Sequence, residues 1–504
     1  MTDTVDAPPA EPAAAGPATF DSLDPGTGAV LASHPIASDA DVDAAVARAR
    51  AAFGRWGALS FDERRRHLKV FKAEIVRDLE GLAAVVHAEN GKPRADAILE
   101  VVATIDHLDW ASKHAGKVLG PSRVSTGLLG ANQAATVEYQ PLGVVGVIGP
   151  WNYPVFTPMG SIAYALSAGN AVVFKPSEYT PGVGIWLGEA WRRAVPGLAD
   201  VFQVITGLGA TGAALCRADI DKLAFTGSAP TGRKVMATCA ERLTPVLMEL
   251  GGKDAMIVDD DADIDAAVDG ALWSAMSNAG QTCVGIERVY ATAPVYDAFV
   301  EQLTARAAEL RAGSGDDASY GPITMPGQIE IIRRHIEEAV ADGATVLTGG
   351  TIDGAYVAPT VLVDVPEDGT AMVEETFGPT IAVAKVADAD EAIERTNATR
   401  YGLGGSVFTG SRSRGMDLAR RMRSGMTSIN AVNAFSTIPG LPFGGVGESG
   451  FGRIHGPDGL REFTRAKAIT RQRFALPIPM LSFRRPADAT DKVVKLVKRL
   501  HGRG

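Results

Sequence analysis

The chain has 504 residues, which is long for one hydrophobic core, so we expect two or more domains. Hydrophobic residues make up 46% and charged residues 21% of the sequence, a balance typical of soluble globular proteins. The formal net charge of −10 argues against nucleic-acid binding by the molecule as a whole.

The three cysteines, Cys216, Cys239 and Cys283, are odd in number and widely spaced. This pattern fits free thiols in a reducing compartment better than a disulfide framework. The sequence contains no Cys-x-x-Cys pair or histidine cluster that would indicate a metal site. We expect a cytoplasmic protein that binds no metal.

Residues 1–18 are rich in Ala and Pro and lack the basic start and apolar core of a signal peptide, so we expect a disordered tail. Residues 38–115 are predicted to be helical, beginning with a capping box formed by Ser38 and Asp41. A second helix is expected to run from Ser60 to Gly91-Lys92-Pro93.

From residue 142 short apolar β-rich runs alternate with helical stretches, a pattern typical of parallel sheets covered on both faces. The fold class is therefore α/β, with two doubly wound units that meet near Leu250. The expected strands are 143–148, 171–175, 201–205, 222–226 and 245–250 in the first unit, and 255–258, 288–291, 345–350, 381–386 and 405–410 in the second.

Two glycine-containing turns follow strands of the first unit. "GLGATG" at 207–212 matches a dinucleotide-binding pattern, but no acidic residue follows about 20 positions later, so a loop that serves packing is favoured. At Gly227 and Ser228 a helix should begin, and its N–H groups with the Ser228 hydroxyl could hold a pyrophosphate. The alternative is that Ser228 only caps the helix.

Four further side chains carry reactive or polar groups at strand ends or glycine turns. Lys175 and Glu178 follow a strand and could bind ribose hydroxyls, or they form a solvated loop. Asn152 could donate to an oxyanion, or it satisfies a tight turn. Glu249, before two glycines, could act as a general base, or it is a structural acid.

Cys283 alone is more often a small buried residue than a nucleophile. Together with an amide donor, a base and cofactor-binding turns, however, it completes the parts of one reaction. The motifs "PWNYP", "FKPSE", "FTGS", "ELGGK", "NAGQTC", "EETFGP" and "PFGGVGESGFG" occur in this order. Over about residues 20–475 the chain resembles the NAD(P)-dependent aldehyde dehydrogenase superfamily. "GKDAMIV" and "QTCVGIERVY" are similar to a bacterial branch that includes diapolycopene-dialdehyde dehydrogenases.

The resemblance implies a role for each of these positions. Cys283 would be the nucleophile, Glu249 the base, and Asn152 with the Cys283 N–H the oxyanion hole. The NAD-binding residues would be Trp151, Lys175, Glu178, Gly227, Ser228, Glu375 and Phe377, and the substrate pocket would contain Tyr153, Phe156, Gly160 and Phe443. NAD is expected over NADP, because Glu178 should repel a 2′-phosphate; Lys175 leaves a route to NADP.

The resemblance also implies a domain plan. Residues 19–124 and 142–249 would form the NAD-binding domain, 250–448 the catalytic domain, and 125–141 with 466–478 an oligomerisation ribbon. A homodimer or homotetramer is then expected.

Position 160 bears on the substrate, because many relatives have a bulky Trp there and some succinate-semialdehyde enzymes have an Arg. Gly160 should widen the tunnel, unless another side chain fills the space. We expect oxidation of a long-chain or aromatic apolar aldehyde. The alternatives are a small semialdehyde such as succinate semialdehyde, an acylating CoA-dependent enzyme, against which Glu249 argues, and an inactive binding protein.

Residues 479–504 form a basic extension in which Val493, Leu496, Val497 and Leu500 recur at helical spacing. Such a helix can lie weakly on an anionic membrane. The alternative is that it docks on the body or on a neighbouring subunit, with its lysines facing water.

Overall fold

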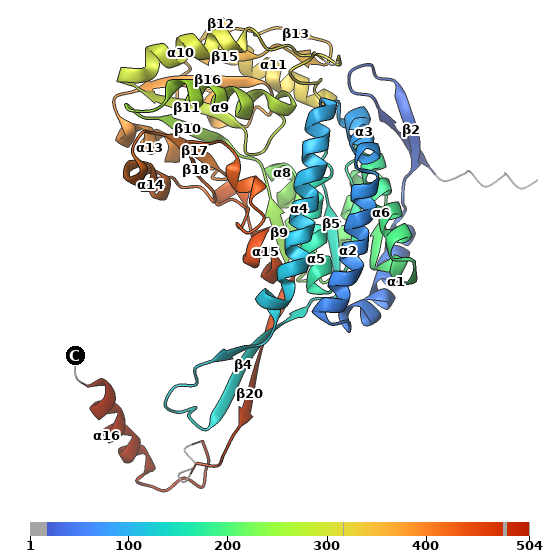
Figure 1. Cartoon of the computed structure of the whole chain (residues 1–504), viewed down its shortest axis with the longest axis vertical. Helices are drawn as coiled ribbons and strands as arrows, with labels where there is room; N and C mark the ends of the chain where they lie inside the picture. The colour runs from blue at the N-terminus through green and yellow to red at the C-terminus, as the bar shows by residue number, and fades with distance from the viewer. Residues whose placement is uncertain (1–17, 316, 477–480, 503–504) are drawn as a thin grey trace, which may run out of the picture.

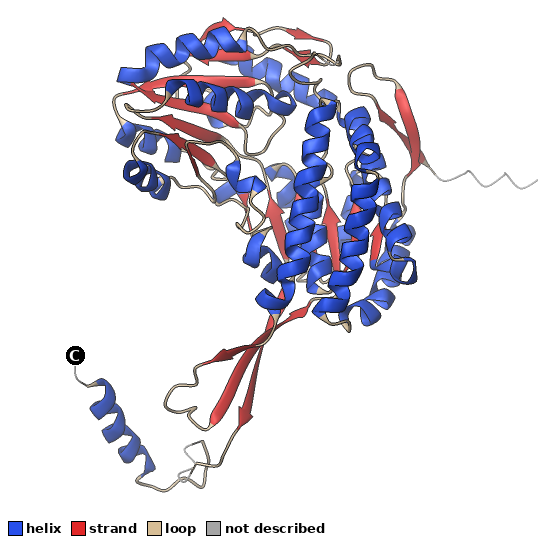
Figure 2. Ribbon diagram, in the orientation of Figure 1, coloured by secondary structure: helices blue, strands red, loops and turns tan. Residues whose placement is uncertain are grey.

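The computed structural model describes residues 18–315, 317–476 and 481–502 (Figure 1). The tail predicted over 1–18 therefore lies, except for Ala18, outside the described residues, as do four residues of the C-terminal extension. The described chain forms two α/β domains and a projecting ribbon, and helices flank both sheets (Figure 2). This arrangement confirms the predicted fold class.

The first domain is built on a six-stranded sheet of order β19-β9-β8-β5-β6-β7. Its neighbouring strands run parallel except at one edge, where β19 pairs antiparallel with β9. The strands are β5 (Val144–Ile148), β6 (Ala171–Lys175), β7 (Phe202–Val204), β8 (Lys222–Thr226), β9 (Val246–Glu249) and β19 (Gly450–Phe451). Because β19 comes from the far end of the chain, that segment joins the first domain.

The helices of the first domain begin after a hairpin of β1 (Thr19–Leu23) and β2 (Val30–Pro35). They are α1 (Asp39–Gly57), α2 (Phe61–Arg77), α3 (Leu79–Asn90), α4 (Arg94–Leu119), α5 (Phe156–Ala168), α6 (Pro181–Ala194), α7 (Gly209–Arg217) and α8 (Ala229–Ala240). Both bonds of the predicted Ser38–Asp41 capping box are present. The single helix expected after Ser60 is two helices, because the backbone of Asp78 (φ −125°, ψ 41°) leaves the helical conformation.

The second domain is built on a seven-stranded sheet of order β12-β15-β16-β11-β10-β17-β18. Its strands are β10 (Asp254–Val258), β11 (Ile286–Thr292), β12 (Thr345–Thr348), β15 (Thr360–Val363), β16 (Thr380–Val386), β17 (Gly405–Phe408) and β18 (Ser428–Ile429). Its helices are α9 (Ile264–Met276), α10 (Ala293–Ala307), α11 (Pro326–Ala341), α12 (Thr370–Val373), α13 (Ala389–Asn397) and α14 (Arg412–Arg421). The pattern analysis missed β15, and β12 runs antiparallel to it.

A short hairpin of β13 (Ile352–Asp353) and β14 (Tyr356–Val357) lies apart from this sheet. After the second domain the chain returns to the first. Phe443, Leu460 and Phe463 are buried in the same hydrophobic core as side chains of α4 and α5, and α15 (Gly456–Glu462) packs there. This return brings residues near 443–455 to the junction where the site forms.

The ribbon consists of three antiparallel strands in the order β20-β4-β3. They are β3 (Ser122–Val124), β4 (Gln133–Pro141) and β20 (Thr464–Gln472), with Val137 opposite Ala468. Beyond the ribbon, α16 (Ala489–His501) stands apart from both domains (Figure 1). Within the described residues, no helix is long and apolar enough to cross a membrane.

Candidate active site

The loop that carries Cys283 is fixed by an unusual turn. Asn278, Ala279 and Gly280 follow one another with positive φ of 50°, 56° and 70°. Only glycine fits the third position, because a Cβ there would lie 2.0 Å from the carbonyl oxygen of Gly378. Gln281 locks the turn: its Nε2 donates to the Asn278 carbonyl (2.9 Å) and its Oε1 accepts from the Thr324 N–H (2.8 Å).

Asn152 follows β5 and is tied directly to this turn. Its side-chain Nδ2 donates to the Gln281 carbonyl at 2.9 Å, and its own carbonyl accepts from Asn278 Nδ2 at 3.0 Å. The side chain is 5% exposed. Since an amide nitrogen carries two hydrogens, one remains to donate to an oxygen developing beside Cys283. The structure thus brings together the predicted nucleophile loop and the predicted amide donor.

A buried ion pair that the pattern analysis missed supports Asn152. Lys92 Nζ donates to Glu100 Oε2 at 2.6 Å and to the Asn152 carbonyl at 2.8 Å. Glu100 Oε1 accepts the N–H groups of Val155 (2.8 Å) and Phe156 (3.0 Å), which open α5. The only sequence signal was weak, because Lys92 belonged to a helix-ending Gly-Lys-Pro and Glu100 lay among apolar helix positions.

Glu249 ends β9 with its side chain buried. The Glu249 carbonyl accepts the Gly227 N–H at 3.1 Å. This backbone bond joins the predicted base to the turn of Gly227 and Ser228 that is predicted to hold the pyrophosphate. Oε1 has no hydrogen-bond partner among the described residues, and a Cβ at Gly444 would lie 2.7 Å from it. Burial raises the pKa of Glu249 well above its ordinary value, with Arg453 acting in the opposite direction. Burial therefore favours the neutral carboxyl, which must lose its proton to act as a base.

Burial also raises the pKa of the Cys283 thiol, and the charges of Glu249 and Glu375 add to the effect. The Val284 N–H works against this shift by bonding to the sulfur. Cys283 is therefore a neutral thiol at rest. Because Glu249 is among the groups that perturb it, the two predicted catalytic side chains share one site.

The predicted cofactor residues Lys175, Glu178, Gly227 and Ser228 lie at or just after the carboxyl ends of β6 and β8, which flank β5 in the first sheet. Lys175 Nζ is 3.7 Å from Glu178 Oε2 after β6. Ser228 is exposed at the start of α8 and makes no side-chain cap bond; its hydroxyl donates to Thr231 Oγ1 at 3.1 Å. Ser228 thus occupies the N-cap position of α8 without a side-chain cap bond. Gly212 packs near Lys175, with its ideal Cβ 3.6 Å from Lys175 Cδ.

Across the junction, Glu375 and Phe377 sit on a loop of the second domain. Glu375 Oε1 accepts the Gly252 N–H at 2.9 Å, and burial raises the pKa of Glu375 to about 8. The Phe377 ring meets Trp151 edge-on, with centroids 5.5 Å apart. Another pair missed from sequence, Lys253 and Glu287, holds the loop, since Glu287 accepts the Phe377 N–H at 2.9 Å.

These positions fit a dinucleotide. An exposed hydroxyl stands at a helix N-terminus, a lysine and a carboxylate lie at the sheet edge, and aromatic rings face them across the junction. When bound, such a cofactor supplies a hydride acceptor.

The predicted substrate pocket differs at one position. Tyr153 OH and Thr282 Oγ1 are 3.0 Å apart, beside the nucleophile, and Phe156 and Phe443 lie nearby around His455. The space beside Gly160 is filled, because a Cβ there would lie 2.7 Å from His455 Nε2. The expected widening of the tunnel at Gly160 is therefore wrong, and the stated alternative of a filling side chain is what the structure has.

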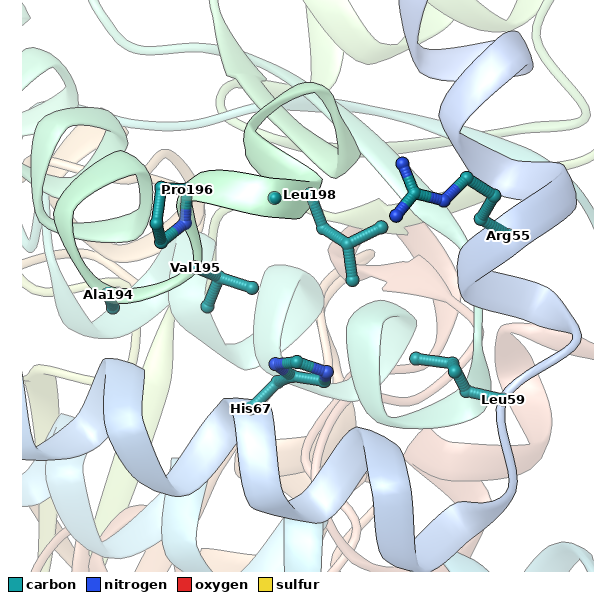
Figure 3. A pocket seen from close by; sticks show the side chains of 8 residues that line it. Arg55, Leu59, His67, Ala194, Val195, Pro196 and Leu198 are labelled. Atoms are coloured by element: carbon teal, nitrogen blue, oxygen red, sulfur yellow. The ribbon is translucent and has the colours of Figure 1, made fainter.

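A separate surface depression lies outside this site. Figure 3 shows this depression, which is lined by Arg55, Leu59, His67 and residues 194–198, none of which belongs to the site above. Its volume is about 530 Å³. Among the described residues, no group of three or more His, Cys, Asp or Glu side chains could hold a metal ion.

A partly buried thiol that shares a site with a carboxyl and an amide donor, at the junction of two α/β domains, is typical of a cysteine-dependent oxidoreductase. The aldehyde dehydrogenase family model matches residues 13–469, and the chain belongs to this family. It is an NAD(P)-dependent aldehyde dehydrogenase by this membership and by its relatives.

Named relatives and solved structures support this assignment. A protein of Mycobacterium ulcerans named "Putative succinate-semialdehyde dehydrogenase (NADP(+)) 2" is 36% identical over 463 residues, covering 90% of this chain and 89% of the relative. PnpE from Pseudomonas sp. WBC-3 in complex with nicotinamide adenine dinucleotide has 34% identity and a TM-score of 0.86, covering 92% and 96% of the two chains. An E. coli NADP-dependent enzyme has 33% identity and a TM-score of 0.86, covering 90% and 95%.

Proposed function

We propose that this enzyme oxidises an apolar long-chain or aromatic aldehyde to the carboxylic acid with NAD, through a thiohemiacetal and then a thioester on Cys283. The observation that carries the chemistry is the shared site of Cys283, Glu249 and the Asn152 amide. The support for an apolar substrate is the aromatic lining by Tyr153 and by Phe156 and Phe443 around His455.

Ionised Glu249 takes the thiol proton of Cys283 and passes it to solvent. The sulfur then bonds to the aldehyde carbon, while the Asn152 amide and the Cys283 N–H donate to the resulting alkoxide. After hydride has left the carbon, the thioester remains on Cys283. Glu249 in its ionised form takes a proton from water, and the hydroxide attacks the thioester and releases the acid and the thiol. This role for Glu249 also favours hydrolysis over acyl transfer to CoA.

The cofactor preference rests on Glu178. A carboxylate can accept from a ribose 2′-hydroxyl but repels a 2′-phosphate, so we propose NAD over NADP. Lys175, 3.7 Å away, offsets part of that repulsion. NADP appears in the names of the mycobacterial relatives, and those names make NADP the alternative.

The names of the mycobacterial relatives also make succinate semialdehyde the alternative substrate. A terminal carboxylate needs a cation in the pocket. Position 160 carries none, and its neighbour His455 is buried with its pKa lowered well below the ordinary value. These features favour the apolar aldehyde.

We also propose that the ribbon of β3, β4 and β20 mediates a homodimer or homotetramer in the cytoplasm. The exposed β20 strand, whose side chains are open along nearly its whole length, supports this role. For α16 we propose weak contact with an anionic membrane. Its apolar Val494, Leu496 and Leu500 are exposed beside basic side chains.

The test is a panel of aldehydes assayed by absorbance at 340 nm with NAD and with NADP. Oxidation of long or aromatic aldehydes with the highest kcat/KM is expected. Succinate semialdehyde as the best substrate would contradict the proposed class, and turnover only in the presence of CoA would contradict the hydrolytic route.

A further inference from the structure

Two histidines whose rings are in contact lie beside the proposed substrate pocket. His107 comes from α4 and His455 from the turn before α15, and their ring centroids are 3.9 Å apart. The residues are 2% and 0% exposed. His107 Nε2 is 3.0 Å from the Ser436 carbonyl oxygen, whereas His107 Nδ1 and both ring nitrogens of His455 have no partner among the described residues.

This arrangement is unfavourable for stability by itself. A buried polar atom without a hydrogen bond lowers stability, because it has lost its contact with water and gained no partner. The His455 backbone (φ 61°, ψ 165°) also lies in a region that is almost restricted to glycine, which adds backbone strain. A side chain that only filled the space beside Gly160 would not need ring nitrogens. The cost therefore points to a ligand for those nitrogens.

The surroundings of His455 include two rings of the proposed substrate pocket, those of Phe156 and Phe443. Its ring centroid is 5.4 Å from that of Phe156, 5.6 Å from Phe443 and 5.7 Å from Tyr164. Phe156 opens α5 directly after the Asn152 loop, so one short segment carries both the oxyanion donor and a wall of this pocket. His455 is thus a polar group within an otherwise aromatic lining.

We propose that His455, whose ring packs at a tilt against that of His107, determines specificity by hydrogen bonding an uncharged oxygen, a hydroxyl or carbonyl, at the distal end of the aldehyde. This inference rests on the proposed function and names its substrate class: an apolar body that ends in a neutral polar oxygen. An imidazole can donate through one nitrogen and accept through the other, so both kinds of oxygen can bind.

The charge state of the pair distinguishes this class from semialdehydes with a terminal carboxylate. Burial lowers the pKa of His107 to about 4, and burial together with His107 lowers the pKa of His455 well below its ordinary value. Both rings are therefore neutral at pH 7. A neutral imidazole does not compensate a buried carboxylate, whose transfer from water without a cation is costly.

The experiment compares aldehydes of equal length that end in a methyl, a hydroxyl or a carboxylate, over a range of chain lengths and with 4-substituted benzaldehydes. For the wild-type enzyme we expect kcat/KM to be about tenfold higher for the best hydroxyl member than for its methyl counterpart, the effect of one buried hydrogen bond.

His455→Leu should bring this ratio of kcat/KM values close to one, mainly through KM, and His455→Asn should restore part of it. His67→Leu, in the depression of Figure 3, is the matched control and should keep the wild-type ratio.

The outcomes separate the two claims. The inference about His455 is overturned if the wild-type enzyme oxidises the methyl series but shows no preference for hydroxyl members at any length. It is also overturned if a hydroxyl preference survives in His455→Leu. Both results leave the proposed function standing. If no aldehyde is oxidised, the proposed function fails, and primary amides of the same lengths test the contact without turnover. If calorimetry then shows that the hydroxyl and methyl amides bind equally well, the inference about His455 is overturned as well. The wild-type comparison stands even if a variant fails to fold.

Discussion

Lys92 and Glu100 form an ion pair whose side chains are each 1% exposed, and this pair holds both ends of the Asn152 loop. Lys92 bonds the Asn152 carbonyl, and Glu100 bonds the backbone that opens α5. The amide proposed as the oxyanion donor is therefore positioned through its backbone by a buried ion pair.

Removing one member of this pair should be costly. Lys92→Met leaves Glu100 buried without its cation, so we expect a loss of about 3–5 kcal/mol in unfolding free energy and a lowered kcat. Lys72→Met is the matched control, since Lys72 and its partner Asp109 are each 27% exposed and the expected loss is below about 1 kcal/mol. Denaturant unfolding and NADH production measure the two effects, and equal losses in both variants would contradict the role of Lys92.

Glu178→Ala should relax the cofactor preference. The Glu178 side chain is 37% exposed at the sheet edge, and its removal eliminates repulsion of a 2′-phosphate while Lys175 remains. We expect kcat/KM with NADP to rise and that with NAD to fall, each severalfold. A wild-type enzyme that already prefers NADP, or a variant with an unchanged ratio of the two, would refute the assignment.

Glu89 should make stability depend on pH. Its carboxylate accepts the Gly182 and Val183 N–H groups, yet burial raises its pKa to about 7. Between about pH 4.5 and 7 the folded protein holds a proton that the unfolded chain has released, so this group's contribution to stability falls as pH rises. Glu89→Gln should therefore show a smaller fall in unfolding free energy from pH 5 to pH 8, by up to about 3 kcal/mol. An unchanged slope would show that Glu89 is ionised in the fold.

The C-terminal extension should bring the enzyme to anionic vesicles. Residues 481–502 contain six Lys or Arg and two Asp, and Leu481 and Phe483 are exposed beside α16. We expect the full-length chain to float with vesicles of anionic lipid at low salt and less so at high salt. Equal partitioning of a chain that ends at Arg485 would exclude membrane contact and favour docking on a neighbouring subunit.

The sequence predicted the strands best where continuous apolar runs mark buried parallel strands. The bounds of β6 and β8 match their predicted ranges, because both strands are buried and their ends meet polar turns. The four-residue strand β15, which lies between β12 and β16, was missed, as was the two-residue edge strand β19, whose pairing with β9 depends on a distant segment. The break at Asp78 was missed because the apolar stripe continues across it.

For the site, motif order located Cys283, Glu249 and Asn152, but it did not indicate what surrounds them. Gly160 was expected to leave space, and the side chain that fills it lies 295 positions further along the chain. Lys92, Glu100 and Glu287 act through contacts between distant segments, which local periodicity does not contain.

The most direct test of the mechanism is the mass of the enzyme after a single turnover. Glu249→Gln mixed with NAD and a long-chain aldehyde should release about one NADH per subunit and then turn over slowly, because thioester hydrolysis lacks its base. The intact mass should increase by that of the acyl group, which peptide mapping should place on Cys283, and Cys283→Ala should give neither the burst nor the adduct. A burst of NADH without an adduct on Cys283, or full steady-state activity of Cys283→Ala, would contradict the account.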